Sequence, residues 1–169
     1  MTFTMLSLSV ALAAPPRPAR AADPSQVEQD GPAREAAEAR PSQQALVQAL
    51  SVREPAPTCA SLSALSTAPV DDLAWVVSNV TSPPWAGMKA AECLVLDHTE
   101  AARPLIDTWV TEPRLKGLGW VVLKHLDAMP RPVALEIARL AVDKGPDPEG
   151  ARRRIRRSKV PEIQALGAE

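Results

Sequence analysis

The hydrophobic positions from Ser42 to Leu166 follow the spacing of helices. Apolar residues recur at i, i+3, i+4 and i+7, as in Leu73, Val76, Val77 and Val80, which is the pattern of one helix face rather than of a strand. The apolar stretches are about 10–14 residues long and are separated by very short breaks. The sequence therefore predicts an all-α protein built from short amphipathic helices.

Prolines and small hydroxyl residues mark where the predicted helices begin. Ser42, Thr58 and Thr99 precede apolar runs, and their hydroxyls can accept hydrogen bonds from free N–H groups of a first turn. Pro69 falls where a first-turn proline belongs, and Thr111-Glu112-Pro113 is a strong helix-start signal with Thr111 as the cap. Ser82 to Pro84 is a clear break, and Pro130 and Pro132 open another helix. Gly145 to Pro148 closes that helix and caps the next, with Asp147 before Pro148.

The leucines that end predicted helices recur at a nearly constant interval. Leu65, Leu96 and Leu126 each stand just before a second helix begins, at spacings of 31 and 30 residues. A period near 30 that holds two helices is typical of α-solenoids, whose units are too small to fold alone and must stack. We therefore expect a short α-solenoid of about four helix-turn-helix repeats over residues 43–166.

Three segments resemble the short HEAT-like repeats of the chromophore-lyase (PBS-lyase) type. Met88–Leu94 (MKAAECL) is similar to the first helix of such a unit, Ala101–Ile106 (AARPLI) to its second helix, and Ser158–Leu166 to a closing half-repeat. The Asp-Pro-x-Val-Arg turn of the family is not present in clean form, and Ser82–Lys89 stands in its place. The resemblance covers residues 43–166 and implies a stacked helical array, here in an exported bacterial member of the family.

The N-terminal 42 residues have a different character. Met5–Ala14 carries no charge, is too short to span a bilayer, and fits the apolar core of a secretory signal peptide. Small residues at −3 and −1 favour cleavage after Ala21, with Ala13 as the second choice. We expect residues 1–21 to be a signal peptide and residues 22–42 to be a disordered tether. The protein is then exported to the periplasm or the exterior, and is cytoplasmic if the signal peptide is absent.

Composition narrows what can fill the core. The single phenylalanine is Phe3 and there is no tyrosine, so the folded part relies on aliphatic side chains and four tryptophans. Trp75, Trp109 and Trp120 fall within helical patterns and are expected in the core. Trp85 stands at a proline-rich break, where it either packs or is exposed and marks a contact surface.

Two further positions carry expectations about packing. Met88 is expected to face the core together with Ala91, Leu94 and Val95, because these residues share one helix face. Gly117 and Gly119 lie inside a helical pattern and are expected to let neighbouring helices approach closely, rather than to form a phosphate-binding loop.

Cys59 and Cys93 are the two cysteines of the chain and stand 34 positions apart, close to one repeat. Helices one unit apart lie side by side in a stack, so these residues can come within reach of a disulfide, which an oxidising compartment favours. The alternative is a pair of buried free thiols. Together with His98 and His125 they lack the paired spacing of a zinc site, and we expect no bound metal.

The net charge of −1 hides an uneven distribution. Residues 151–159 (ARRRIRRSK) carry six positive charges and no negative charge, and form a candidate site for an anion or an acidic partner surface: Arg152, Arg153, Arg154, Arg156, Arg157 and Lys159. The competing interpretation, which we favour, is a solvated helix face paired with nearby carboxylates. No aromatic residue interleaves these cations to stack bases, so nucleic acid is not the expected partner.

No catalytic motif is recognisable. Asp97 with His98, and His125 with Asp127, are too close in sequence to share a helix face, and no nucleophile elbow is present. Asp71 and Asp72 fall where acids stabilise the first turn of a helix. We therefore expect a non-enzymatic protein without a cofactor that binds another protein as an interaction or scaffold module. The alternatives are an enzyme accessory of the chromophore-lyase type, which implies a bound tetrapyrrole, and an anion-binding module built on the basic segment.

Overall fold

The computed structural model describes residues 39–168 of the 169-residue chain. These residues form nine α-helices and two 3-10 helices, and no strand occurs among them. The predicted all-α class is confirmed. The predicted signal peptide, residues 1–21, lies outside the described residues, as does the predicted tether apart from residues 39–42.

The helices follow one another along the chain with short breaks between them. Their bounds are α2 (Pro41–Ser51), α3 (Cys59–Ser63), α4 (Pro69–Asn79), α5 (Pro84–Asp97), α6 (Arg103–Thr111), η2 (Pro113–Leu115), α7 (Lys116–Lys124), η3 (Leu126–Ala128), α8 (Arg131–Lys144), α9 (Pro148–Ile155) and α10 (Pro161–Leu166).

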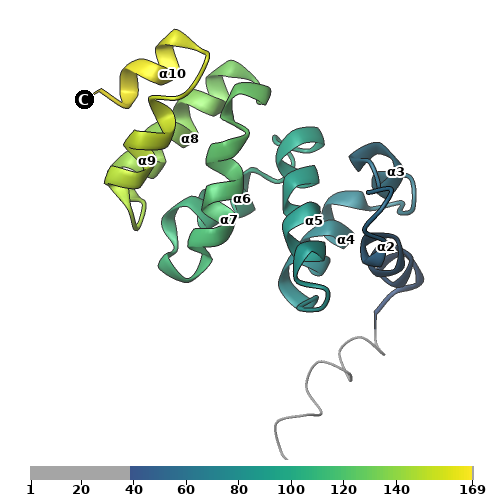
Figure 1. Cartoon of the computed structure of the whole chain (residues 1–169). Coiled ribbons are helices and arrows are strands. Elements are labelled where there is room, and N and C mark those ends of the chain that lie inside the picture. Colours follow the sequence, from purple (N-terminus) through teal and green to yellow (C-terminus); the bar gives the residue numbers. More distant parts are fainter. Residues whose placement is uncertain (1–38, 169) are drawn as a thin grey trace, which may run out of the picture.

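Helices that are close in sequence are also close in space, so the described chain runs from one end of the molecule to the other (Figure 1). The most extensive contacts are those of α4 with α5, of α6 with α7 and of α8 with α9. Successive pairs are joined through α2 with α4, α6 with α8 and α8 with α10, and through α3 with α5, α5 with α7 and α7 with α9. Each helix therefore depends mainly on its neighbours along the chain.

Most side-chain bonds that join one helix pair to the next span a similar sequence offset. They connect residues 30–35 positions apart, as in Arg40–Asp72, Ser63–His98, Arg103–Glu136, Lys116–Asp147, Asp127–Ser158, Arg131–Glu162 and Arg154–Lys124. Residues about thirty positions apart thus face each other at several points of the described chain.

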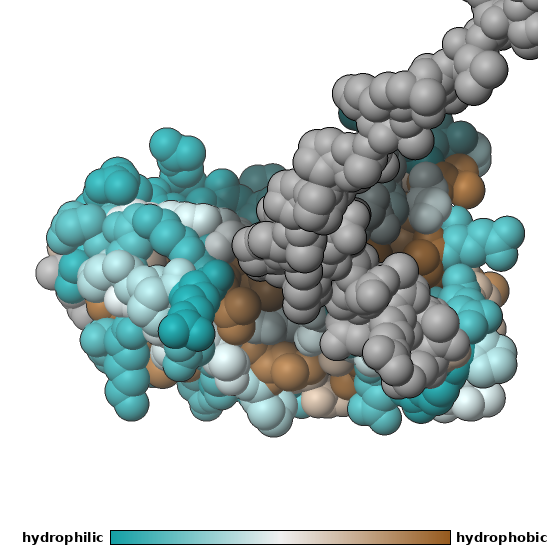
Figure 2. All heavy atoms as spheres, turned by 90° about the horizontal axis from the view of Figure 1, so that it is seen from below, coloured by the Kyte–Doolittle hydropathy of each residue, from teal (hydrophilic) through white to brown (hydrophobic). Residues whose placement is uncertain are grey.

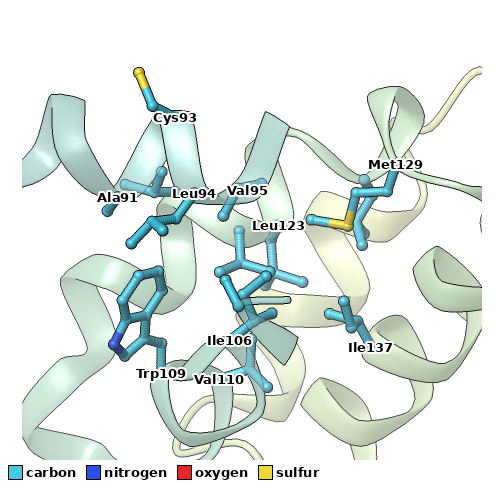
Figure 3. Packing of buried hydrophobic residues seen from close by; sticks show 14 of the residues in the cluster. Ala91, Cys93, Leu94, Val95, Ile106, Trp109, Val110, Leu123, Met129 and Ile137 are labelled. Carbon is cyan, nitrogen blue, oxygen red and sulfur yellow. The ribbon is translucent and has the colours of Figure 1, made fainter. Parts of the chain in front are cut away.

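The core is one cluster of buried, mostly aliphatic side chains that continues from α2 to α10. Figure 3 shows its middle part, where Leu94 and Val95 of α5 lie near Ile106 and Val110 of α6. Among the tryptophans, Trp109 is 4% exposed, and Trp75 and Trp120 are partly buried against the same cluster. The prediction of a core position is confirmed for Trp109, whereas Trp75 and Trp120 only pack against the edge of the core.

Proline opens most of the helices. Seven of the nine described α-helices carry proline in their first two positions. The ring fixes φ near the helical value, and no hydrogen bond is lost because first-turn N–H groups have no partner within the helix. Two predicted caps are also confirmed: Thr58 accepts from the Ser61 N–H at 3.1 Å, and Asp147 accepts from the Gly150 N–H at 2.9 Å.

Three other predicted caps are wrong. Helix α2 begins at Pro41, with Arg40 in the N-cap position and its N–H donating to Gln43 Oε1 at 2.9 Å, so Ser42 lies inside the first turn. Thr99 is buried and donates to the Val95 carbonyl at 2.5 Å, while α6 begins at Arg103. Thr111 is the last residue of α6 and donates to the Asp107 carbonyl at 2.8 Å. Both threonines bond back to the carbonyl four residues earlier, which is the competing use of a hydroxyl near a helix end.

The two glycines of α7 lie in different surroundings. A Cβ atom at Gly119 would stand 2.8 Å from the Trp109 carbonyl oxygen, so α6 and α7 approach closely there, as predicted. A Cβ atom at Gly117 would meet nothing within 4 Å. The expectation of a close helix approach is therefore wrong for Gly117, which faces open space.

The surroundings of Gly117 and Gly119 predict opposite effects of a glycine-to-alanine substitution on the free energy of unfolding. Gly119→Ala should lower the free energy of unfolding by about 1–3 kcal/mol, because a backbone atom must move to admit the methyl group. Gly117→Ala should raise it by about 0.5 kcal/mol, since alanine loses less conformational entropy on entering a helix. Urea unfolding followed by circular dichroism measures both, and equal effects of the two changes would contradict the assignment.

Asp72 connects the start of α4 to α2 and to the preceding turn. Its side chain is 1% exposed, accepts a hydrogen bond from Ser66 at 2.5 Å and pairs with Arg40 at 2.5 Å. Burial raises the pKa of Asp72, but the hydrogen bonds from Ser66 and Ser42 and the charge of Arg40 together bring this pKa below its ordinary value of 3.8. Asp72 is thus an ionised carboxylate that links α4 to Arg40 and Ser66, as well as an acid in the first turn of a helix.

Asp72→Asn should therefore lower the free energy of unfolding by about 1–3 kcal/mol at pH 7. A lowered folded pKa means that the stabilisation is present above pH 3.8 and is lost as the pH falls through the folded pKa. Urea unfolding at pH 7 and below pH 3.8 should show the gap between wild type and variant shrinking. The matched control is Asp71→Asn, which changes an exposed acid of the same turn and should have little effect at either pH.

Candidate functional site

An open groove of about 490 Å³ lies between the end of α2 with the segment that follows it and the helices α5 and α7. We call it the α5–α7 groove. Most of its lining is apolar, from Leu50, Val52, Ala56, Pro57, Trp85, Met88, Trp120 and Val121, and the charged lining residues are Arg53, Lys89, Glu92 and Lys124. No single helix pair contains this groove, because its walls come from α2, α5 and α7.

Exposed hydrophobic side chains are concentrated at this groove. The described residues expose four large hydrophobic side chains, of which Val52 (50%), Trp85 (42%) and Met88 (42%) line the groove, while Leu65 (41%) does not. Figure 2 shows hydrophobic side chains gathered along the middle of one face, with hydrophilic side chains beside them. A patch of this kind is typical of a binding surface.

Met88 corrects an expectation. The helical pattern predicts that it faces the core with Ala91, Leu94 and Val95, yet it is exposed while the other three are buried. A helix that packs on one partner along only part of its length leaves some apolar positions of its inner stripe uncovered. Which positions remain uncovered depends on the neighbouring helices and not on the helix itself.

Trp85 is held in a defined position. Its indole N–H donates to the Leu50 carbonyl at the end of α2, at 3.0 Å, and the Arg53 guanidinium lies 5.6 Å from the centre of its ring. The hydrogen bond satisfies the polar atom of the side chain, and the cation–π contact fixes one face of the ring. The prediction that Trp85 is either packed or exposed resolves as exposed, within the first turn of α5.

Glu92 of α5 lies close to the basic side chains of α5 and α7 that line the groove. Its carboxylate lies 2.9 Å from His125 Nε2, 3.1 Å from Lys89 Nζ and 3.5 Å from Lys124 Nζ. Burial raises the pKa of Glu92, but the charges and hydrogen bond of these neighbours lower it by more, so the pKa lies below its ordinary value. Burial also lowers the pKa of His125 despite the adjacent carboxylate. At neutral pH the groove is therefore lined by three cations and one anion.

Cys59 and Cys93 are brought to disulfide distance, with sulfurs 2.09 Å apart and Cα atoms 5.1 Å apart. The one-repeat spacing predicts this proximity, and the alternative of two free thiols is not what the structure shows. Figure 3 shows the Cys93 side chain pointing away from Leu94 and Val95, since the bond runs from α5 to α3. Cys93 is fully buried and Cys59 packs against the same core cluster. The bond is compatible with an oxidising compartment.

The disulfide also bears on the groove. Residues 52–56 are exposed and form one wall of it through Val52, Arg53 and Ala56. This wall leads directly into α3, which has only five residues and buries only Leu62. The bond to Cys93 therefore anchors the end of the wall to α5.

The six basic residues of the C-terminal segment differ in the contacts that they make. Arg154 donates to the carbonyls of Leu123 and Lys124 at the end of α7, at 3.4 and 3.1 Å, where a cation is favourable. Arg156 donates to the Gly167 carbonyl at 3.0 Å, and Arg152 pairs with Glu149 at 3.2 Å. The other three candidates, Arg153, Arg157 and Lys159, are exposed. Half of the predicted site thus makes contacts within the fold, and anion binding by the rest stays a prediction.

The sequence analysis missed a pairing of Ser63 with His98. Ser63 Oγ lies 2.9 Å from His98 Nε2, which joins α3 to the end of α5. No carboxylate of the described residues is hydrogen-bonded to His98, and the pair lies at one end of the disulfide-linked helices.

Within residues 39–168, no three His, Cys, Asp or Glu side chains gather as metal ligands. None of the helices described there has the length and apolar character to cross a membrane.

No family model, no curated protein and no solved structure matches this chain. The resemblance to HEAT-like repeats therefore rests on the three segments that carry it. Met88–Leu94 lies in α5 and Ala101–Ile106 leads into α6. Because α5 packs chiefly on α4, and α6 on α7, these two segments belong to successive helix pairs rather than to one.

Loss of the disulfide should destabilise the protein. In the chain-entropy account, a closed loop of 34 residues contributes about 3–4 kcal/mol, so Cys59→Ser with Cys93→Ser should lower the free energy of unfolding by that amount. Guanidinium unfolding measures it, and the wild type treated with a reductant should match the double variant. Mass spectrometry of non-reduced, alkylated protein is the independent check, because two alkylated thiols would contradict the bond.

Proposed function

We propose that this chain is a non-enzymatic, exported helical-repeat protein of the HEAT-like kind, and that it binds another protein as an interaction or scaffold module. The observation that carries the proposal is the α5–α7 groove. It gathers three exposed hydrophobic side chains on an array of helix pairs. Exposure of such side chains to water costs free energy that a bound partner would recover.

The sequential pairing of the helices supports the repeat part of the proposal. Most side-chain bonds between successive pairs span 30–35 residues, close to the interval of 30–31 between the helix-ending leucines. In a solenoid each unit contacts only its neighbours, and the stacked units present an extended surface. A stack of about four units accounts for both regularities.

The character of the groove supports protein binding over the alternatives. Tryptophan and methionine held at the centre of an open surface are typical anchors of protein interfaces. The anion-binding alternative is weakened because Arg152, Arg154 and Arg156 make contacts within the fold. No described residue beyond the repeat pattern favours a tetrapyrrole.

The export part of the proposal is supported by the cysteine pair. A bond between Cys59 and Cys93 persists in the periplasm or outside the cell, where no reducing pool removes it. An uncharged segment at Met5–Ala14 points to the same location.

The proposal predicts site-specific contact with a partner in the producing cell. A photo-crosslinking benzoylphenylalanine in place of Met88 should give one reproducible adduct with a different protein, because this side chain lines the groove. The same residue in place of Leu65, which is equally exposed outside the groove, is the matched control. Adducts in equal amount from both positions, or none from Met88, would contradict the proposal.

A further inference from the structure

We infer that the α5–α7 groove takes an acidic peptide segment that carries bulky apolar side chains. The segment would place its apolar side chains against Trp85, Met88 and Trp120, and a carboxylate against Arg53 or Lys124. This inference rests on the proposed function and names the chemistry of the partner.

The dimensions of the groove favour a short segment over a broad protein face. About 490 Å³ is the size of a small-ligand site and holds a few side chains. Its lining comes from the end of α2, the stretch that follows it, α5 and α7, and the groove is open to solvent. Grooves of this form bind a helix or an extended peptide through a few anchoring side chains.

The charges of the groove favour an acidic partner. Three cations and one carboxylate line it. The carboxylate of Glu92 is already engaged by His125 at 2.9 Å and by Lys89 at 3.1 Å, and Lys124 is more distant at 3.5 Å. Lys124 is also largely exposed, so a carboxylate from outside can reach it.

Arg53 is, beside Lys124, the second groove cation that a carboxylate of the partner can reach. It lies over the Trp85 ring at 5.6 Å, and no carboxylate of the described residues forms an ion pair with it. A partner carboxylate that approaches Arg53 would lie beside the apolar ring and be partly removed from water. Such a pair is stronger than one in open solvent, and charge complementarity of this kind selects among partners.

Gly117 offers a test that changes charge and little else. It lines the groove, and a side chain added there would begin in open space. Gly117→Glu and Gly117→Lys place side chains of similar reach and opposite charge at the same point of α7. Both remove the same helical glycine, so a difference between them reports the charge of the occupant.

The experiment selects peptides from a random 12-residue display library on the oxidised full-length chain. The enriched peptides should combine acidic residues with aromatic or large aliphatic residues. With one enriched peptide labelled, fluorescence anisotropy should show binding weakened at least about tenfold by Gly117→Glu and kept or strengthened by Gly117→Lys. Trp85→Ala should weaken binding, and Leu65→Ala should not.

Several results would overturn the inference. Enrichment of neutral or basic peptides would do so, and so would equal effects of the two Gly117 substitutions. Binding that Arg157→Glu abolishes and Arg53→Glu does not would move the site to the basic segment. Light scattering that shows a dimer, dissociated by both Gly117 substitutions, would identify a second copy as the occupant.

The outcome also separates this inference from the proposed function. If no peptide is enriched while the crosslinker at Met88 captures a protein, the acidic-segment inference fails and the interaction function stands. If both experiments are negative, both proposals fail.

Discussion

The structure depends on contact between successive helix pairs. Helices of five to fourteen residues are marginal in water by themselves, because the cost of nucleation is not recovered over so few turns. Each pair must therefore bury its apolar stripe against the next, and one cluster of buried side chains runs through all of them. The ion pairs and hydrogen bonds between pairs follow the same order, with partners one unit apart.

The groove is a consequence of this stacking. Its walls come from α2, α5 and α7, which belong to different pairs, so its shape is set only when the neighbouring pairs are in contact. The segment after α2 needs additional anchoring because α3 is short and buries little. The hydrogen bond from Trp85 to Leu50 joins the end of α2 to α5, and the Cys59–Cys93 bond joins the start of α3 to α5, so the segment is anchored at both of its ends.

Trp85 is exposed although aromatic side chains are scarce in this chain. With no tyrosine and with Phe3 as the single phenylalanine, the core is filled by leucine, valine, isoleucine and alanine, together with Trp109. Small buried residues such as Ala90 and Gly119 allow helices to pack closely. In a chain with so little aromatic bulk, a tryptophan left 42% exposed is not used for core volume, which agrees with a role at a binding surface.

The sequence by itself determined the helical class, most helix starts and the 34-residue spacing of the cysteines. The first two features are local, because apolar periodicity and first-turn prolines act within one helix. Only the tertiary structure decided that Met88 is exposed, that Thr99 and Thr111 bond backwards instead of capping, and that the basic segment is divided between internal contacts and solvent. The exposure of Met88 and the position of Arg154 depend on packing with other helices, and the two threonines choose between capping and bonding backwards, which a local pattern does not specify.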